Sequence, residues 1–294
     1  MTSEHRVRAI DAGRKLVDVA KDRLAVLAIS EVGEFVRAGG VFVDGAPGDI
    51  NDQVQQGAVL TIDATALAEL AEADRLTRPS SAPVTVCHED DDLVVVDKPA
   101  GMHVHPMGEY RDDTLVGALL WHAGARPDAP WAAWRPRPTH RLDRGTSGLV
   151  LVAKRAEVQR AVDLLRQDGA VRRTYRADVV GHVEEDAGTI DAPIGVDPND
   201  DRRRAVVAET DGGQHAVSHW RVVRRGAGTT QLELTLDTGR THQLRVHLAH
   251  LGHPILGDVR YGGPPTDDVG IALRAVRLAL PHPTTGAPFE VHAP

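Results

Sequence analysis

The chain has 294 residues, of which 41% are hydrophobic and 26% are charged, and its formal net charge is −8. These values are ordinary for a globular protein, and the length allows a large domain plus a small one. No apolar run reaches the length of a membrane span, residues 1–8 lack a signal-peptide core, and the single cysteine, Cys87, excludes an intrachain disulfide and a multi-thiolate metal site. We therefore expect a cytoplasmic protein.

The charges are unevenly distributed along the chain. A negative net charge disfavours nucleic-acid binding, because phosphate contacts need Lys and Arg. Arginines nevertheless gather in three segments, away from the acidic residues at 69–74 and 89–92. The clustered arginines are Arg135, Arg137, Arg141, Arg144, Arg172, Arg173, Arg176 and Arg202 to Arg204. A local basic face on an acidic protein is therefore allowed.

Residues 12–64 are expected to form a small separate unit. Two helical patterns precede Gly39-Gly40, and two short strand patterns with a tight turn follow. The segments are 16–26 and 30–38 for the helices, 41–43 and 59–62 for the strands, and Asp44-Gly45 for the turn. This order resembles an S4-type RNA-binding domain. A purely structural unit remains the alternative, because Glu31 and Glu34 lie beside a lone Arg37, and fold likeness does not carry function.

Residues 65–84 are expected to link this unit to a larger domain. An Ala/Glu-rich stretch, 66–74, predicts a short helix, and 78–83 has the composition of a linker. The larger domain, 85–294, is expected to begin with strands at 84–86 and 93–97.

Three helices are expected to start at polar residues that can cap a helix. Ser30, Thr65 and Asp113 are the candidate N-caps. The third of these helices would cover residues 114–120. Between the strand at 93–97 and this helix, Lys98 lies in an irregular Pro/Gly turn and is a candidate phosphate contact.

Residues 121–139 hold three tryptophans among prolines, Trp121, Trp131 and Trp134. One interpretation is a platform on which unpaired bases stack. The other, which we favour, is a loop packed by its own large side chains.

Residues 140–154 are the most informative stretch of the chain. Leu149 to Ala153 is an apolar run that predicts a strand buried on both faces. Before it, Asp143-Arg144-Gly145 predicts a turn in which Gly145 adopts a positive φ, so a carboxylate would sit at the mouth of a rigid strand. The string His140-Arg141-Leu142-Asp143, followed by Thr146-Ser147-Gly148-Leu149, resembles the signature of RluA-type RNA pseudouridine synthases. The Lys-Pro-Ala-Gly turn at 98–101 is another feature of that family.

A helix at 157–167 and a strand at 173–179 are expected next. Tyr175 and Ala177 resemble the family segment that supplies an active-site tyrosine, with Arg173 where the family usually has Lys. Residues 193–204 are expected to form an arginine-rich surface loop, either contacting phosphate or merely solvated.

The second strong motif is Gly239-Arg240-Thr241-His242-Gln243-Leu244-Arg245. Alternating leucines at 232, 234 and 236 predict a strand, and 241–251 predicts a helix with Leu244, Leu248 and Leu251 toward the core. His242 and Arg245 would share one stripe of that helix. This motif, continuing through Gly257-Asp258 and Tyr261-Gly262, resembles the same family, in which its second Arg pairs with the catalytic Asp. Residues 271–294 predict two short strands and a turn.

Other chemistries have little support in the sequence. His242, His247, His250 and His253 lack the spacing of zinc ligands and have no acidic or cysteine partners nearby, so hydrogen-bonded histidines are the better interpretation. Phosphate-cradling glycine loops and the Gly-x-Ser-x-Gly elbow are also missing.

The resemblance implies an α+β catalytic domain on a mixed, largely antiparallel sheet, with a small S4-like α/β domain before it. It implies isomerisation of uridine in RNA to pseudouridine, without metal or cofactor. Asp143 would start glycosidic cleavage, Arg245 would pair with it, and Tyr175 would stack on the base. The candidate RNA contacts are Lys98, His140, Arg141, Arg144, Arg173, Arg240 and His242.

The identity of the RNA stays open at this point. Ribosomal RNA is favoured and transfer RNA is allowed, while the atom that Asp143 attacks and the oligomeric state cannot be read from the sequence. Two other functions also stay open: a non-catalytic RNA-binding or ribosome-assembly protein on the same scaffold, and a hydrolase that releases free uracil.

Overall fold

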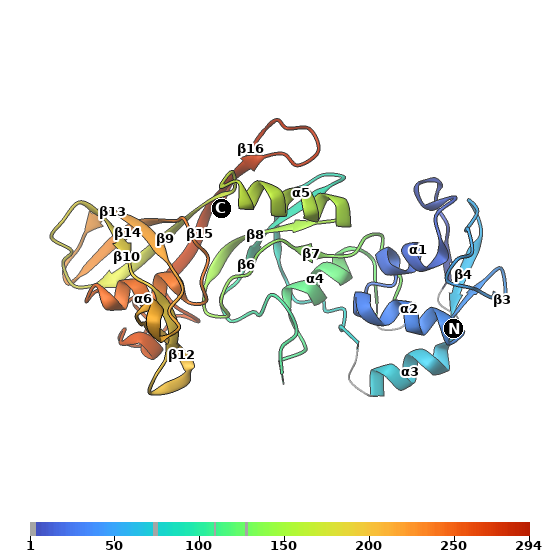
Figure 1. Ribbon diagram of the computed structural model, residues 1–294, viewed down its shortest axis with the longest axis horizontal. Coiled ribbons are helices and arrows are strands. Elements are labelled where there is room, and N and C mark those ends of the chain that lie inside the picture. Colours follow the sequence, from blue (N-terminus) through green and yellow to red (C-terminus); the bar gives the residue numbers. More distant parts are fainter. Residues whose placement is uncertain (1–3, 73–75, 109, 127–128) are drawn as a thin grey trace. The chain divides into compact units, whose positions relative to one another are not determined.

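The computed structural model describes residues 4–72, 76–108, 110–126 and 129–294, in two compact units (Figure 1). The first unit comprises Met1–Pro83, His103–Pro138 and Ala153–Ala156, and the second comprises Val84–Met102, Thr139–Val152 and Glu157–Pro294. The expected boundary near residue 84 coincides with one junction. The segment 103–138, which we assigned to the larger domain, clusters with the first unit.

In its described residues, the first unit contains a small antiparallel sheet with strand order β1-β4-β2-β3 and the α-helices α1 to α4. Val41 pairs with Ile62, and the turn at Asp44-Gly45 has the positive φ angles expected of a tight hairpin. The elements are β1 (Glu4–Arg6), α1 (Leu16–Arg23), α2 (Ile29–Arg37), β2 (Val41–Val43), β3 (Ala46–Pro47), β4 (Val59–Ile62), α3 (Ala64–Glu72), α4 (Leu115–His122) and β7 (Arg137–Pro138). The predicted order of helices and strands in residues 12–64 is thus confirmed.

The tryptophan-rich loop belongs to the core of this first unit. Trp131 is buried in the same cluster as Leu24 and Val41, and its ring stacks on His5 at 5.3 Å. Arg135 is buried too, and its guanidinium donates to the carbonyl of Leu24, the C-cap of α1, and to that of Leu27 in the segment that follows. A cation that satisfies the last carbonyls of a helix stabilises its end. These contacts support the packing interpretation of this loop over a platform for bases.

The second unit is built on one large sheet with strand order β10-β13-β14-β9-β15-β8-β6-β5, and β16 pairs with β15 (Figure 1). Strand β15 runs parallel to β8 and antiparallel to β9, so the predicted mixed, largely antiparallel sheet is confirmed. The strands are β5 (Thr85–Glu89), β6 (Leu93–Lys98), β8 (Ser147–Ala153), β9 (Arg172–Val180), β10 (Ala187–Asp191), β11 (Ile194–Asp197), β12 (Asp200–Val206), β13 (Val217–Arg225), β14 (Thr229–Leu236), β15 (Leu273–Pro281) and β16 (Pro288–His292), and the helices are α5 (Ala156–Gln167) and α6 (Gln243–His250).

The hydrophobic pattern explains why these strands form. Leu149 to Ala153 in β8 are all buried, as the continuous apolar run predicts. In β14, Leu232 and Leu234 are buried while Glu233 between them is not, which is the period of two expected for a half-buried strand. The segment 193–204 is a hairpin of β11 and β12, so the predicted loop was wrong.

All three predicted N-caps were wrong by one or two residues. Helix α2 begins after Ala28, so Ser30 lies in its first turn. The Asp63 carboxylate accepts from the backbone N–H groups of Thr65 and Ala66 at the start of α3, and Thr114 caps α4 by accepting from Gly117. Neighbouring polar residues compete for a cap, and local spacing alone does not decide among them.

The predicted linker is anchored in its described part. Arg78 forms an ion pair with Asp112 at 3.0 Å, and the Ser80 hydroxyl donates to Asp113. Residues 73 and 74, the predicted end of the helix at 66–74, lie outside the described residues. In the part of the chain that the structure covers, no helix combines the length and the apolarity that crossing a membrane requires.

Candidate active site

Asp143 lies in a loop that leads directly into the buried strand β8. The Asp143 carbonyl accepts from the backbone N–H of Thr146 at 3.1 Å, which closes the turn and leaves the carboxylate free for other partners. The positive φ occurs at Gly148 (112°), so the prediction for Gly145 was wrong. A Cβ on Gly148 would lie 2.2 Å from the Ala275 carbonyl oxygen, and only glycine therefore lets β15 approach β8 this closely.

The Asp143 carboxylate pairs with Arg245 on α6. Nη1 of Arg245 donates to Oδ2 of Asp143 at 3.1 Å. The other side of the same guanidinium is held by Asp258, because Nε donates to its Oδ2 at 2.7 Å and Nη2 donates to its Oδ1 at 2.8 Å. Burial opposes the charge of Arg245, but the hydrogen bonds and charges of Asp258 and Asp143 outweigh burial and raise its pKa. Arg245 is thus a fixed cation between two carboxylates.

Asp143 and Arg245 line a cavity of about 130 Å³ in the second unit. Tyr175 on β9 is buried in its wall, where β9 pairs with β14 and β15. The cavity brings together all three predicted catalytic residues and four of the predicted RNA contacts, with apolar side chains between them. The lining residues are Arg141, Leu142, Asp143, Thr146, Arg173, Tyr175, Leu236, Gly239, Arg240, Thr241, His242, Gln243, Leu244, Arg245 and Leu273. A planar base between apolar walls, facing an ion-paired carboxylate, is the kind of ligand that such a cavity fits.

Three predicted RNA contacts lie outside this cavity. Lys98 is fully buried, and its ammonium donates to the carbonyls of Pro99 and Met102 at 2.8 and 2.9 Å. Burial lowers the pKa of Lys98 to about 8, although Asp143 and Asp97 oppose that shift. Because this ammonium is enclosed by protein, the predicted phosphate contact at Lys98 was wrong.

His140 and Arg144 both hold the segment around Asp143. Nε2 of His140 accepts from the Leu151 N–H at 3.2 Å, and burial lowers the pKa of this imidazole to about 3. His140 therefore acts as a neutral structural group that ties the loop to β8. Arg144 is exposed, and its Nε donates to the Gly101 carbonyl at 3.1 Å.

The geometry adds three residues to which sequence reasoning assigned no role. Asp258 is 1% exposed and clamps Arg245, and the Tyr261 hydroxyl lies 2.7 Å from Nδ1 of His242. The Gln243 amide accepts from Thr238 and from the Arg240 N–H and also donates to the Val217 carbonyl, so it fixes the start of α6. The sequence signal for them was the second motif, which contains Gln243 and continues through Asp258 and Tyr261.

The start and end of α6 differ from the prediction. The helix begins at Gln243, and His242 precedes it in a left-handed conformation instead of continuing the turn. Arg245 and His242 nevertheless both face Asp143, at 3.1 and 3.8 Å. Leu251, which we expected in the core, is 38% exposed at the end of the helix.

Three of the four histidines in this region, His242, His247 and His253, form hydrogen bonds, and His250 is exposed. His247 is buried, with Nδ1 near the Ser218 hydroxyl and Nε2 near the Ala192 carbonyl, and His253 contacts the Val180 carbonyl. Within the described ranges, no group of three or more His, Cys, Asp or Glu is arranged to hold a metal ion.

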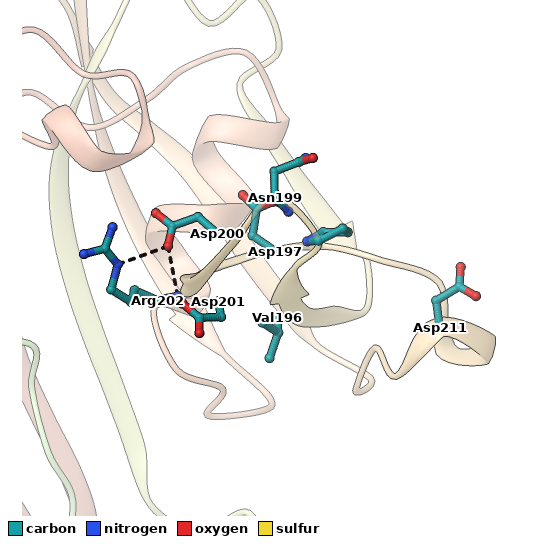
Figure 2. A pocket seen from close by; sticks show the side chains of 8 residues that line it. Val196, Asp197, Asn199, Asp200, Asp201, Arg202 and Asp211 are labelled. Atoms are coloured by element: carbon teal, nitrogen blue, oxygen red, sulfur yellow. Dashed lines mark hydrogen bonds and ion pairs between the residues drawn. The ribbon is translucent and has the colours of Figure 1, made fainter.

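A larger hollow of about 830 Å³ lies away from this site, at the turn between β11 and β12 (Figure 2). Four aspartates line it, Asp197, Asp200, Asp201 and Asp211, and Arg202 pairs with Asp200 at 3.3 Å. Its size does not make it the functional site, because carboxylates repel phosphate and no catalytic pair faces it.

Comparison with known proteins gives one consistent result. Residues 92–250 match the family model described as RNA pseudouridylate synthase. The chain is 36% identical over 296 residues to ribosomal large subunit pseudouridine synthase D of Pseudomonas aeruginosa, covering 96% of this chain and 88% of that protein. It is 40% identical over 257 residues to the protein of the same name from Nitrosomonas europaea, covering 84% of this chain and 71% of the other.

Solved structures agree with these sequence matches. The structure of human RNA pseudouridylate synthase domain containing 1 is similar with a TM-score of 0.61 and 26% identity, covering 74% of this chain and 85% of that one.

Proposed function

Because this chain belongs to the RNA pseudouridylate synthase family, we propose that it isomerises specific uridines of large-subunit ribosomal RNA and that Asp143 carries the reaction. The enzyme class is that of an isomerase acting on RNA. In this isomerisation, the bond from ribose C1′ to uracil N1 breaks and a bond from C1′ to C5 forms. The proton on C5 leaves, and N1 gains one, so that the atoms of substrate and product are the same.

The choice of ribosomal RNA is supported by the names of relatives that match along most of this chain. Ribosomal RNA is made in the cytoplasm of bacteria, and we propose that the protein acts there. Transfer RNA is the alternative substrate in the test below.

Access to the glycosidic bond requires that the uridine leave its stack. Arg141 is exposed and lines the cavity. We propose that it fills the space that the flipped base vacates or contacts the neighbouring phosphate. The exposed Arg144 and Arg240 and the half-buried Arg173 supply positive charge for the RNA backbone around that point.

Asp143 is assigned the first step, the cleavage of the C1′–N1 bond. An ionised carboxylate can form a covalent intermediate and so divide one difficult step into two easier ones. Arg245 donates a charge-assisted hydrogen bond to the Asp143 carboxylate and fixes its direction. Tyr175 is assigned to the uracil ring, as a stacking partner and as the group that helps remove the C5 proton.

The N-terminal unit is assigned an accessory role as an S4-like RNA-binding domain. Support comes from its order of two helices, a hairpin and a further strand, which is the order that the S4 resemblance implied. Glu31 and Glu34 on α2 reduce the positive potential of the N-terminal unit. We therefore expect this unit to contribute to the orientation of the RNA more than to binding affinity.

The observation that carries this function is the pairing of Asp143 with a largely buried Arg245, itself anchored by Asp258, in a base-sized cavity. The test is carbodiimide mapping of pseudouridine on unmodified large-subunit ribosomal RNA and on transfer RNA transcripts. Each transcript is incubated with wild type, Asp143→Asn or the matched control Asp163→Asn. Asp163 is an exposed aspartate on α5.

A reverse-transcription stop on ribosomal RNA that appears with wild type and Asp163→Asn, and not with Asp143→Asn, is the expected result. A stop on transfer RNA alone would identify transfer RNA as the substrate and leave the role of Asp143 unchanged. RNA binding that is indifferent to Asp143, with no stop on transcripts or on immature ribosomal particles, would contradict the proposal and indicate a binding protein.

A further inference from the structure

His242 has a strained backbone that local structure does not explain. Its φ and ψ are 59° and 19°, a left-handed conformation that is unfavourable for a residue with a Cβ. The residue precedes α6, but its side chain does not cap the helix. Strain of this kind concentrates at functional sites, where the surrounding structure maintains it. In this conformation, the His242 ring lines the Asp143 cavity.

Tyr261 determines which nitrogen of this ring carries a proton. The buried Tyr261 hydroxyl oxygen accepts from the Arg204 backbone N–H at 3.1 Å and lies 2.7 Å from Nδ1 of His242. Across the described residues, the phenol proton has no other acceptor, and a buried hydroxyl without one is costly. Tyr261 therefore donates to Nδ1, and the His242 proton resides on Nε2.

The surroundings keep both groups in these forms. The Tyr261 ring lies beside the guanidinium groups of Arg245 (4.8 Å) and Arg203 (5.4 Å), and burial raises the phenol pKa, so the hydroxyl stays protonated. Burial is also the main reason that the pKa of His242 falls below 6.5. The charges of Arg245 and Arg260 lower it further, against the opposite effects of Asp143 and Asp258.

The protonated Nε2 has no hydrogen bond within the described part of the chain. It lies 3.8 Å from Oδ2 of Asp143, beyond hydrogen-bond length, and that oxygen already accepts from Arg245. A neutral donor with a fixed direction is therefore available beside the catalytic carboxylate.

We propose that Nε2–H of His242 donates a hydrogen bond to a carbonyl oxygen of the target uracil, and that Tyr261 is a positioning residue that fixes the tautomer. The inference rests on the proposed function. When the C1′–N1 bond breaks, its electron pair stays with the base and spreads onto the carbonyl oxygens. A preorganised donor stabilises such developing charge. His242 gains and loses no proton in this step.

The activity test uses His242→Phe, His242→Gln and Tyr261→Phe with ribosomal RNA under single-turnover conditions. We expect His242→Phe to lower the rate about 100-fold at unchanged RNA affinity, as removal of one such donor does elsewhere. His242→Gln retains a donor and should recover part of the rate. Tyr261→Phe frees the tautomer and should lower the rate less than His242→Phe does. Melting temperatures identify any variant that fails to fold.

The structural test is nitrogen-15 NMR of the imidazole groups without RNA. Signals that vanish in His242→Gln identify His242, and we expect its proton on Nε2 in wild type and a mixture of tautomers in Tyr261→Phe. A proton on Nδ1, or a charged ring at pH 7.5, would overturn the inference.

Different results would refute the role of His242 and the proposed function. An active wild type with an unimpaired His242→Phe overturns the assignment of His242 alone. A wild type that forms no pseudouridine in any RNA removes the proposed function, and the uracil contact with it.

Discussion

The two aspartates that pair with Arg245, Asp143 and Asp258, should contribute very differently to the stability of the protein. Arg245 and Asp258 have side chains that are 11% and 1% exposed, and they share two short hydrogen bonds. Asp143 is 20% exposed and accepts one bond from Arg245 at 3.1 Å. We therefore expect Asp258→Asn to destabilise the protein and Asp143→Asn to leave its stability nearly unchanged.

The loss of unfolding free energy depends on how well the Arg245 charge is still compensated after each substitution. Breaking a buried ion pair by removing one partner costs about 3–5 kcal/mol, because the remaining charge is buried without compensation. Asp143 stays as a counter-ion in Asp258→Asn, so we take the lower end, about 3 kcal/mol. In a protein of this size, that corresponds to a melting temperature lower by roughly 6–12 °C. For Asp143→Asn, with a more exposed partner and one bond, we expect about 1 kcal/mol or less.

The assay is differential scanning calorimetry of wild type, Asp258→Asn, Asp143→Asn and the control Asp237→Asn. Asp237 is an exposed aspartate that contacts His219. Asp258→Asn should also react more slowly, because an unclamped Arg245 no longer holds Asp143 in one direction. A melting temperature of Asp258→Asn equal to that of Asp143→Asn would refute the assignment of Asp258 as the anchor of the pair.

Three further changes test other parts of the structure. In the folded protein, burial lowers the pKa of His140 to about 3, against 6.5 for a free imidazole. Between these two pH values the unfolded chain binds a proton that the folded chain does not. Stability therefore falls as the pH falls from 6.5 towards 3. Urea unfolding at pH 7, 5.5 and 4.5 should show a less steep loss in His140→Gln, by up to about 1.4 kcal/mol per pH unit. Equal slopes would contradict a ring that stays neutral in the folded protein. Gly148→Ala should lower the free energy of unfolding by more than about 3 kcal/mol, because a Cβ at φ 112° meets the Ala275 carbonyl. A soluble variant with the wild-type melting temperature would contradict this close approach. Arg135→Met should lower the unfolding temperature of the N-terminal unit, since the guanidinium bonds to the Leu24 and Leu27 carbonyls just after α1 are lost. Limited proteolysis of residues 16–37 would reveal the change, and unaltered resistance would argue against it.

The sequence predicted most of the architecture because its hydrophobic periods are strong. The continuous apolar run in β8 and the alternation in β14 correspond to the burial that the structure shows. Helix caps were less predictable. The structure caps α3 with Asp63 and α4 with Thr114, whereas the sequence predicted Thr65 and Asp113. A cap depends on φ and ψ at one residue, which tertiary contacts decide.

The candidate site was predictable as a set of residues but not as a network. Motifs located Asp143, Tyr175 and Arg245, and the cavity unites them. Lys98 was misread because a lysine in a Pro/Gly turn gives no sign of its burial, which long-range packing creates. Asp258 was missed because an aspartate thirteen residues after Arg245 has no periodic relation to it.

The most direct test of the account is tritium release from ribosomal RNA labelled at C5 of its uridines. The C5 proton leaves only when the base is reattached through C5, so release reports the complete isomerisation. We predict release by wild type and a rate lower by at least about 1,000-fold in Asp143→Asn, because the removed group takes part in the chemical step. Release at the wild-type rate by Asp143→Asn would contradict the central claim.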